Sequence, residues 1–150
     1  IRIFFYKGAF YRTTHSMGHF SNQHQFVFTD INNKKYENEL QFKNMQLINP
    51  PKTFSTTKSL QLSFDSSSCK PGDEITIGTM GSDSSFSESH TISVNDYSVT
   101  IPVADLQKQK GKDLWLDISI SRDIPLKQNT KEGGKMNLEY KMKPLKLKKG

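Results

Sequence analysis

The stretch DLWLDISIS, residues 113–121, alternates polar and apolar residues along its length. Its aliphatic residues take every second position: Leu114, Leu116, Ile118 and Ile120. Side chains two apart lie on the same face of an extended chain, so these four residues share one face. The intervening residues Asp113, Trp115 and Asp117 share the other. The pattern predicts a β-strand with one face in a core and one face turned outward.

The same alternation recurs in short runs along the rest of the chain. The runs are SLQLSFD (59–65), DEITIGT (73–79), HTISV (90–94), DYSVTIPV (96–103) and KMNLEYKM (135–142). Turn sequences such as KPGD (70–73), KQKGKD (108–113) and KEGGK (131–135) separate them. The one helical turn is expected near ADLQKQK (104–110), which follows a proline. Many short strands joined by turns predict an all-β, antiparallel fold, either a β-sandwich or a barrel.

Residues 49–145 resemble an immunoglobulin or fibronectin type III-like domain in the order of their strands. INPPKTF (48–54) resembles a proline-marked edge strand, and 59–79 resemble strand B, a turn and strand C. Residues 97–121 resemble strand E, a corner and strand F, and 136–142 resemble strand G. Leu114 falls near the family's corner tyrosine, and the usual early-strand tryptophan is missing. The resemblance implies an Ig-like antiparallel β-sandwich and carries no function.

The first 48 residues differ in composition from the rest. Ten of the sixteen aromatic residues occur before residue 45. The sequence predicts additional N-terminal strands there: a hairpin over 1–14, and two strands over 24–42 joined by a turn at Asn32–Asn33. The expected organisation is therefore an aromatic-rich segment 1–48, as an extension of the sandwich or a small subdomain. A sandwich over 49–145 and a basic tail over 146–150 follow.

Positive charge is concentrated near both ends of the sequence. The net charge is +6, and residues 141–150 (KMKPLKLKKG) contain five lysines and no acid. Basic residues also alternate with aromatic ones in IRIFFYKGAFYR (1–12), a mixture that suits single-stranded nucleic acid. The candidate contacts for a polyanion are Arg2, Lys7, Arg12, Lys143, Lys146, Lys148 and Lys149. The alternative is that these charges only keep a tail and a hairpin solvated.

Trp115 is the leading candidate for a binding residue, with Asp113 and Asp117 on either side of it. An aromatic plane flanked by carboxylates can stack on a sugar ring and accept hydrogen bonds from its hydroxyls. The alternative is that the N-terminal strands cover Trp115. As a glycosidase pair the two carboxylates are too far apart, because four strand residues span ~13 Å. Phe86 is the one apolar anchor of GSDSSFSESH (81–90), which is expected to be a flexible loop that could contact a ligand.

The remaining motifs argue against catalysis and against a metal. His15, His19 and His24 lie close in sequence, but strand positions four apart are too distant to share one ion. They are interpreted as part of a polar loop. Cys69 follows a run of serines in a turn and is interpreted as a spare, exposed or half-buried thiol. No phosphate loop, nucleophile elbow or His-Glu-x-x-His motif occurs, so neither an enzyme nor a cofactor is expected.

These features favour a non-catalytic recognition module that binds a protein or glycan through loops or an outer strand face. A polyanion-binding domain for nucleic acid or anionic polysaccharide, and a structural assembly domain, are the alternatives. A single cysteine cannot form an intrachain disulfide, and no run of apolar residues is long enough for a membrane helix. A secreted, cell-surface or virion-associated protein is the expected setting, with this chain as a processed protein or a fragment.

Overall fold

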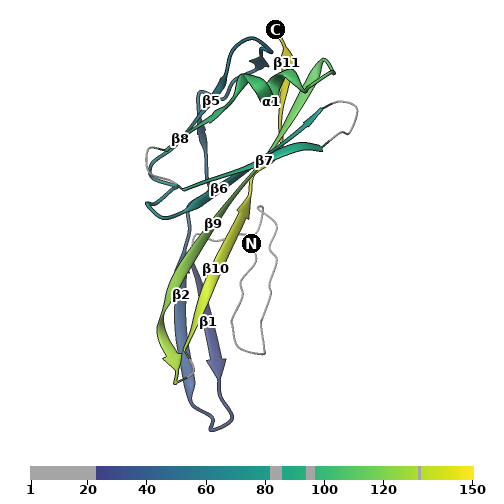
Figure 1. Ribbon diagram of the computed structural model, residues 1–150. Helices are drawn as coiled ribbons and strands as arrows, with labels where there is room; N and C mark the ends of the chain where they lie inside the picture. The colour runs from purple at the N-terminus through teal and green to yellow at the C-terminus, as the bar shows by residue number, and fades with distance from the viewer. Residues whose placement is uncertain (1–22, 82–85, 94–96, 132) are drawn as a thin grey trace. The chain divides into compact units, whose positions relative to one another are not determined.

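The computed structural model describes residues 23–81, 86–93, 97–131 and 133–150, with the backbone alone described over 86–93. These residues form antiparallel sheets and one short helix, so the fold is all-β as expected (Figure 1). The chain divides into two compact units. We call Ile1–Asn44 with Arg122–Glu139 the hairpin unit, and Met45–Ser121 with Tyr140–Gly150 the sheet unit.

The larger sheet has the strand order β4-β11-β9-β6-β7, and β10 also pairs with β9. Its strands are β4 (Thr53–Phe54), β6 (Glu74–Gly81), β7 (Phe86–Ser93), β9 (Asp113–Thr130), β10 (Gly133–Lys141) and β11 (Leu145–Lys149). The β6–β7, β6–β9 and β9–β11 pairs are antiparallel, whereas β4 runs parallel to β11. Strand β9 therefore has neighbours on both sides over its first half. Pro125, which has no N–H to donate, lies beyond the last residue that pairs with β6.

The smaller sheet places β5 (Leu60–Phe64) between β3 (Leu47–Ile48) and β8 (Ser98–Ile101), both antiparallel to it. Helix α1 (Val103–Gln107) follows β8 and begins after Pro102, whose φ of −65° suits the start of a helix. Leu106 of this helix is fully buried. The helical turn expected near 104–110 is thus confirmed.

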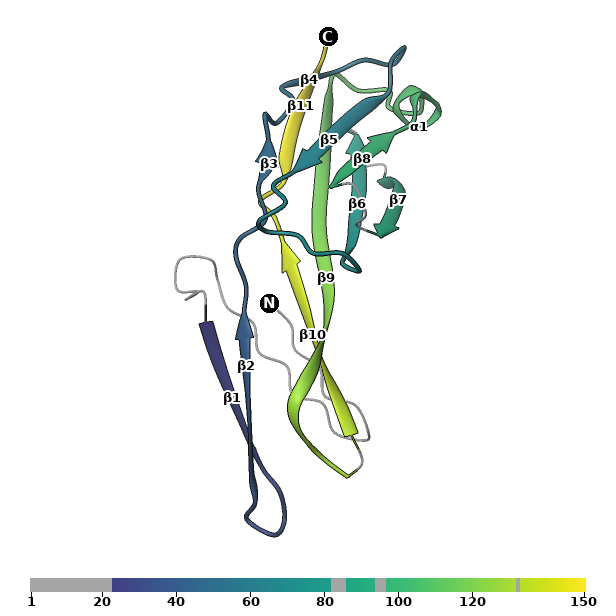
Figure 2. The ribbon, with the colours of Figure 1, turned by 90° about the vertical axis from the view of Figure 1, so that its left-hand side faces the viewer.

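The core of the sheet unit is built from alternate residues of the two sheets. In β9, Leu114 and Leu116 are 0% exposed and Ile118 and Ile120 are 1% exposed. The other buried hydrophobic strand residues of this unit are Phe54, Leu60, Leu62, Phe64, Ile75, Ile77, Val99, Ile101, Tyr140 and Leu147. The two sheets form separate layers (Figure 2), and each buries one face. This arrangement is compatible with a β-sandwich.

The hairpin unit contains β1 (Gln23–Thr29) and β2 (Lys35–Gln41), an antiparallel pair joined where the sequence predicts a turn. Asn33 adopts a φ of 61°, which asparagine tolerates better than most residues. Asp30 Oδ1 accepts hydrogen bonds from the backbone N–H groups of Asn32 and Lys34, each at 2.9 Å. These bonds, above all the one from Lys34, hold the pKa of Asp30 below its usual value.

A second hairpin, made by the end of β9 and the start of β10, belongs to the same unit. The Glu37 N–H donates to Gln128 Oε1 at 2.8 Å, and Asn38 Nδ2 donates to the Gln128 carbonyl at 2.9 Å. In return the Gln128 N–H donates to Asn38 Oδ1 at 3.1 Å. Asn38 is only 4% exposed, so these bonds satisfy an amide that would otherwise be costly to bury. The apolar residues buried in this unit are Tyr36, Leu40, Phe42, Met136 and Leu138.

Three expectations from the sequence need correction. Residues 146–150 are not a separate tail, because Leu145–Lys149 form β11 inside the larger sheet and Leu147 is 0% exposed. The Ser-rich segment is not a loop from Phe86 onward, because Phe86–Ser93 pair with β6. The linear division at residue 48 also differs from the structure, which groups Arg122–Glu139 with Ile1–Asn44. The hairpin predicted over 1–14 lies outside the described residues.

We expect Leu116→Ala to lower the free energy of unfolding by about 2 to 5 kcal/mol, because it leaves a cavity beneath the central strand. Urea denaturation followed by circular dichroism measures this loss. Gln61→Ala, at an exposed position of β5, is the matched control and should change stability by less than about 0.5 kcal/mol. A loss below about 1 kcal/mol for Leu116→Ala would contradict the central place of β9 in the core.

Candidate functional site

The outer face of β9 carries the residues that the sequence nominated for binding. Because Leu114 and Leu116 point into the core, Trp115 between them points outward and is only partly buried. Asp113 and Asp117 lie on the same outward face and are also partly exposed. The structure therefore brings these three predicted residues together on one strand face.

The register of the sheet places one residue from each neighbouring strand beside Trp115. Met80 of β6 is its Cα partner on one side, and Lys146 of β11 is its Cα partner on the other. Met80 is 39% exposed, and Lys146 Nζ lies 5.2 Å from the centroid of the indole ring. We call Met80, Trp115 and Lys146 the outer row. Phe86, the fourth binding residue expected from the sequence, is the Cα partner of Met80 in β7.

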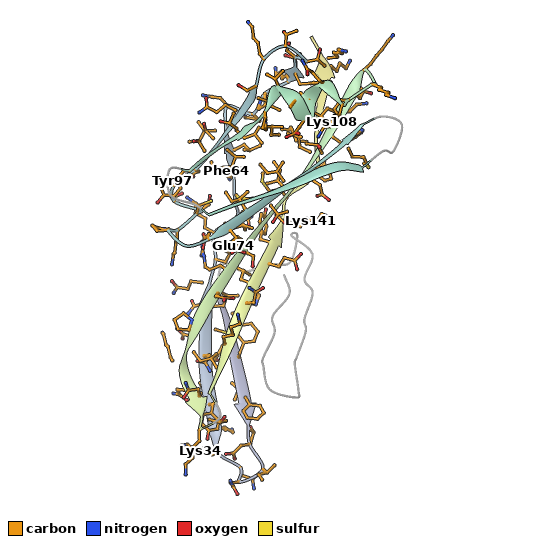
Figure 3. The ribbon with its side chains drawn as sticks, in the orientation of Figure 1. Lys34, Phe64, Glu74, Tyr97, Lys108 and Lys141 are labelled. Carbon is orange, nitrogen blue, oxygen red and sulfur yellow. The ribbon has the colours of Figure 1, made fainter. Side chains whose placement is uncertain are left out.

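Both carboxylates on this face are engaged in ion pairs. Asp113 Oδ2 lies 2.8 Å from Lys146 Nζ, and Asp117 Oδ2 lies 2.6 Å from Lys141 Nζ. Lys141 is the last residue of β10 (Figure 3). The pairs are partly exposed, so each stabilises the fold by ~0 to 1 kcal/mol, but they fix where the side chains lie. Each of the two carboxylates is thus paired with a lysine through its Oδ2, while Asp117 Oδ1 is buried and makes no hydrogen bond.

Lysines from two distant parts of the sequence meet at one end of the larger sheet. Lys112, Asp113, Lys146, Lys148 and Lys149 line an open hollow of about 580 Å³. The Lys149 N–H donates to the Lys112 carbonyl at 2.8 Å, which joins the start of β9 to the end of β11. We call Lys112, Lys146, Lys148 and Lys149 the lysine cluster. Sequence reasoning missed Lys112, because its position beside β11 depends on long-range strand pairing.

The remaining polyanion candidates fall outside this cluster. Lys143 is exposed between β10 and β11 and does not line the hollow. Arg2, Lys7 and Arg12 lie outside the described residues. Of the seven residues predicted to contact a polyanion, three therefore lie together in the sheet unit.

The described residues offer little for metal or thiol chemistry. They contain no group of three or more His, Cys, Asp or Glu side chains placed to hold a metal ion. His24 lies in β1, partly buried, whereas His15 and His19 fall outside the described residues. Cys69 is 2% exposed, so the expectation of an exposed or half-buried thiol is wrong. Because reactive cysteines are at least partly exposed, burial argues against a reactive thiol here.

Comparisons with known proteins were made by family, by sequence and by structure. No family model matches the chain, and neither curated proteins nor solved structures gave a match. Among the helices that the structure describes, none has the length and hydropathy of a transmembrane span. The evidence for function is therefore the geometry of the outer row and the lysine cluster.

We expect Lys146→Gln to make Trp115 easier for acrylamide to quench, because it removes the ammonium group above the ring. Trp115 is the single tryptophan, so its emission reports on this site alone. Loss of the exposed ion pair with Asp113 should lower stability by ~1 kcal/mol or less. Lys148→Gln changes the same charge two residues away and should leave the quenching constant unchanged. Equal quenching in Lys146→Gln and wild type would contradict the contact between Lys146 and Trp115.

Proposed function

We propose that this chain is a non-catalytic recognition module, of a secreted or surface protein, that binds its ligand through the outer row. The observation that carries the proposal is the alignment of Met80, Trp115 and Lys146 across three adjacent strands. Tryptophan and methionine are enriched in protein interfaces, and tryptophan is among the commonest hot-spot residues. A partly exposed Trp beside an exposed Met on a flat strand face suits that role.

The strand order supports an Ig-like sandwich as the framework of this module. In that family, strand F lies between C and G in one sheet, and B pairs with E in the other. Here β9 lies between β6 and β11, and β5 pairs with β8. Strands β9, β6, β5 and β8 correspond to the F, C, B and E segments expected from the sequence. The position of strand G beside β9 is occupied by β11, whereas the segment expected as G, residues 136–142, lies in and just after β10, which also pairs with β9. A sandwich of this kind positions binding residues but does not specify a ligand.

The state of the carboxylates favours a protein ligand over a sugar. A sugar site needs accessible acceptors beside the aromatic ring. Here the Oδ2 atoms of Asp113 and Asp117 are held by Lys146 and Lys141 at 2.8 and 2.6 Å, and Asp117 Oδ1 is buried. A protein can cover paired charges at the rim of an interface at little cost, because rim contacts stay near solvent. The same ion pairs argue against acid-base catalysis. The distance of ~13 Å along the strand from Asp113 to Asp117 also exceeds the carboxylate separation in glycosidases.

We expect Trp115→Ala to weaken ligand binding at least tenfold, because a hot-spot side chain contributes about 2 kcal/mol or more. The probes are peptides enriched from a random phage-displayed library on the wild-type chain, and a glycan array run in parallel. Affinities of enriched peptides and glycans are measured by calorimetry. Bound ligand should also shift the Trp115 emission to shorter wavelength.

Gln61→Ala is the matched control, since Gln61 is exposed on the opposite sheet. It should bind as wild type does. Binders that retain full affinity for Trp115→Ala would overturn the proposal. If glycans bind in a way that depends on Trp115 and no peptide does, the ligand is a glycan rather than a protein, and the site stays the same.

A further inference from the structure

The lysine cluster is a strongly charged surface of the sheet unit that the outer row does not explain. Lys112 precedes β9, whereas Lys146, Lys148 and Lys149 belong to β11. A third segment joins them, because the Lys148 N–H donates to the Lys52 carbonyl at 3.1 Å. Backbone hydrogen bonds thus fix the two segments that carry the cluster lysines to each other and to a third segment at Lys52.

The cluster has little internal neutralisation. Among the residues that the structure describes, Asp113 is the one acidic residue lining the hollow, and its Oδ2 pairs with Lys146. Within the described part of the chain, Lys112, Lys148 and Lys149 make no ion pair. Like charges this close repel one another, and a ligand with several negative groups would relieve that repulsion.

We propose that the lysine cluster binds a linear anionic polysaccharide. This site is separate from the ligand of the outer row, although Lys146 belongs to both. The hollow is open and lined by exposed ammonium groups, not by buried donors that would cradle one small anion. Lys146 and Lys148 alternate along one face of β11, ~7 Å apart, so they present charge as a line. Such a line suits a chain with repeated sulfate or carboxylate groups.

The aromatic surroundings favour a polysaccharide over single-stranded nucleic acid. Nucleic acid of that kind binds to basic grooves that also offer free aromatic faces for base stacking. Two described aromatic residues pair in register with cluster lysines. Phe54, opposite Lys149, is buried, and the ring of Trp115, opposite Lys146, has the Lys146 ammonium group 5.2 Å from its centroid.

The test is calorimetric titration of the full chain with a heparin-derived octasaccharide at several salt concentrations. We expect Lys148→Gln/Lys149→Gln to weaken binding at least tenfold and to reduce the slope of log affinity against log salt by about 1 to 2. Lys70→Gln/Lys131→Gln removes the same charge from exposed positions outside the cluster and should change affinity less than twofold. A dT octanucleotide should bind at least tenfold more weakly than the octasaccharide.

Three results would overturn the proposal. The first is no binding of the octasaccharide by the wild-type chain. The second is an equal loss of octasaccharide affinity in the control and cluster variants, which would mean that binding depends on net charge alone. The third is tight dT binding that depends on Lys148 and Lys149, which would assign the site to nucleic acid. Trp115→Ala should change octasaccharide affinity by less than about twofold. The proposal for the outer row and the proposal for the lysine cluster can therefore fail independently of each other.

Discussion

Burial of alternate residues in β9 is the constraint on which the rest of the sheet unit depends. Leu114, Leu116, Ile118 and Ile120 are 0 to 1% exposed in a strand that has neighbours on both sides. Because a strand repeats every two residues, burying these four also determines which residues face outward. Trp115 is therefore placed by the apolar residues on either side of it. The registers of β6 and β11 against β9 then bring Met80 and Lys146 to the same row.

Much of this fold could be predicted from local patterns, because burial imposes a period of two on each strand. The runs that became β5, β6, β8, β9 and β10 all show it, and the Asn32–Asn33 turn follows from the backbone tolerance of asparagine. The failures came from polar segments. The Ser-rich first part of β7 (86–89) is held by backbone pairing with β6, which requires no apolar pattern, whereas its second part belongs to the run predicted over 90–94. In β11 the alternation of Leu145 and Leu147 was present, but the lysines around it suggested a solvated tail.

The candidate site was predictable only in part, because its residues come together through long-range pairing. Sequence reasoning found Trp115 and its two carboxylates, since they share one strand. It could not find Met80, Lys141 or Lys112, because their positions beside β9 depend on how distant strands align. These neighbours change which residues make up the site, and they also change its charge. Two carboxylates expected to receive sugar hydroxyls are instead paired with lysines.

The length of β9 has a consequence for how this chain tolerates insertions. A single strand of 18 residues contributes its first nine residues (113–121) to the sheet unit and the rest to the hairpin unit. One extra residue within it would exchange the two faces of everything downstream, so that polar side chains would replace the packed ones. Insertions and deletions in β9 should therefore survive only in pairs, whereas the turns that flank it can vary freely in length. Among related chains, differences in length would then occur in the turns, and the number of residues in β9 would stay constant.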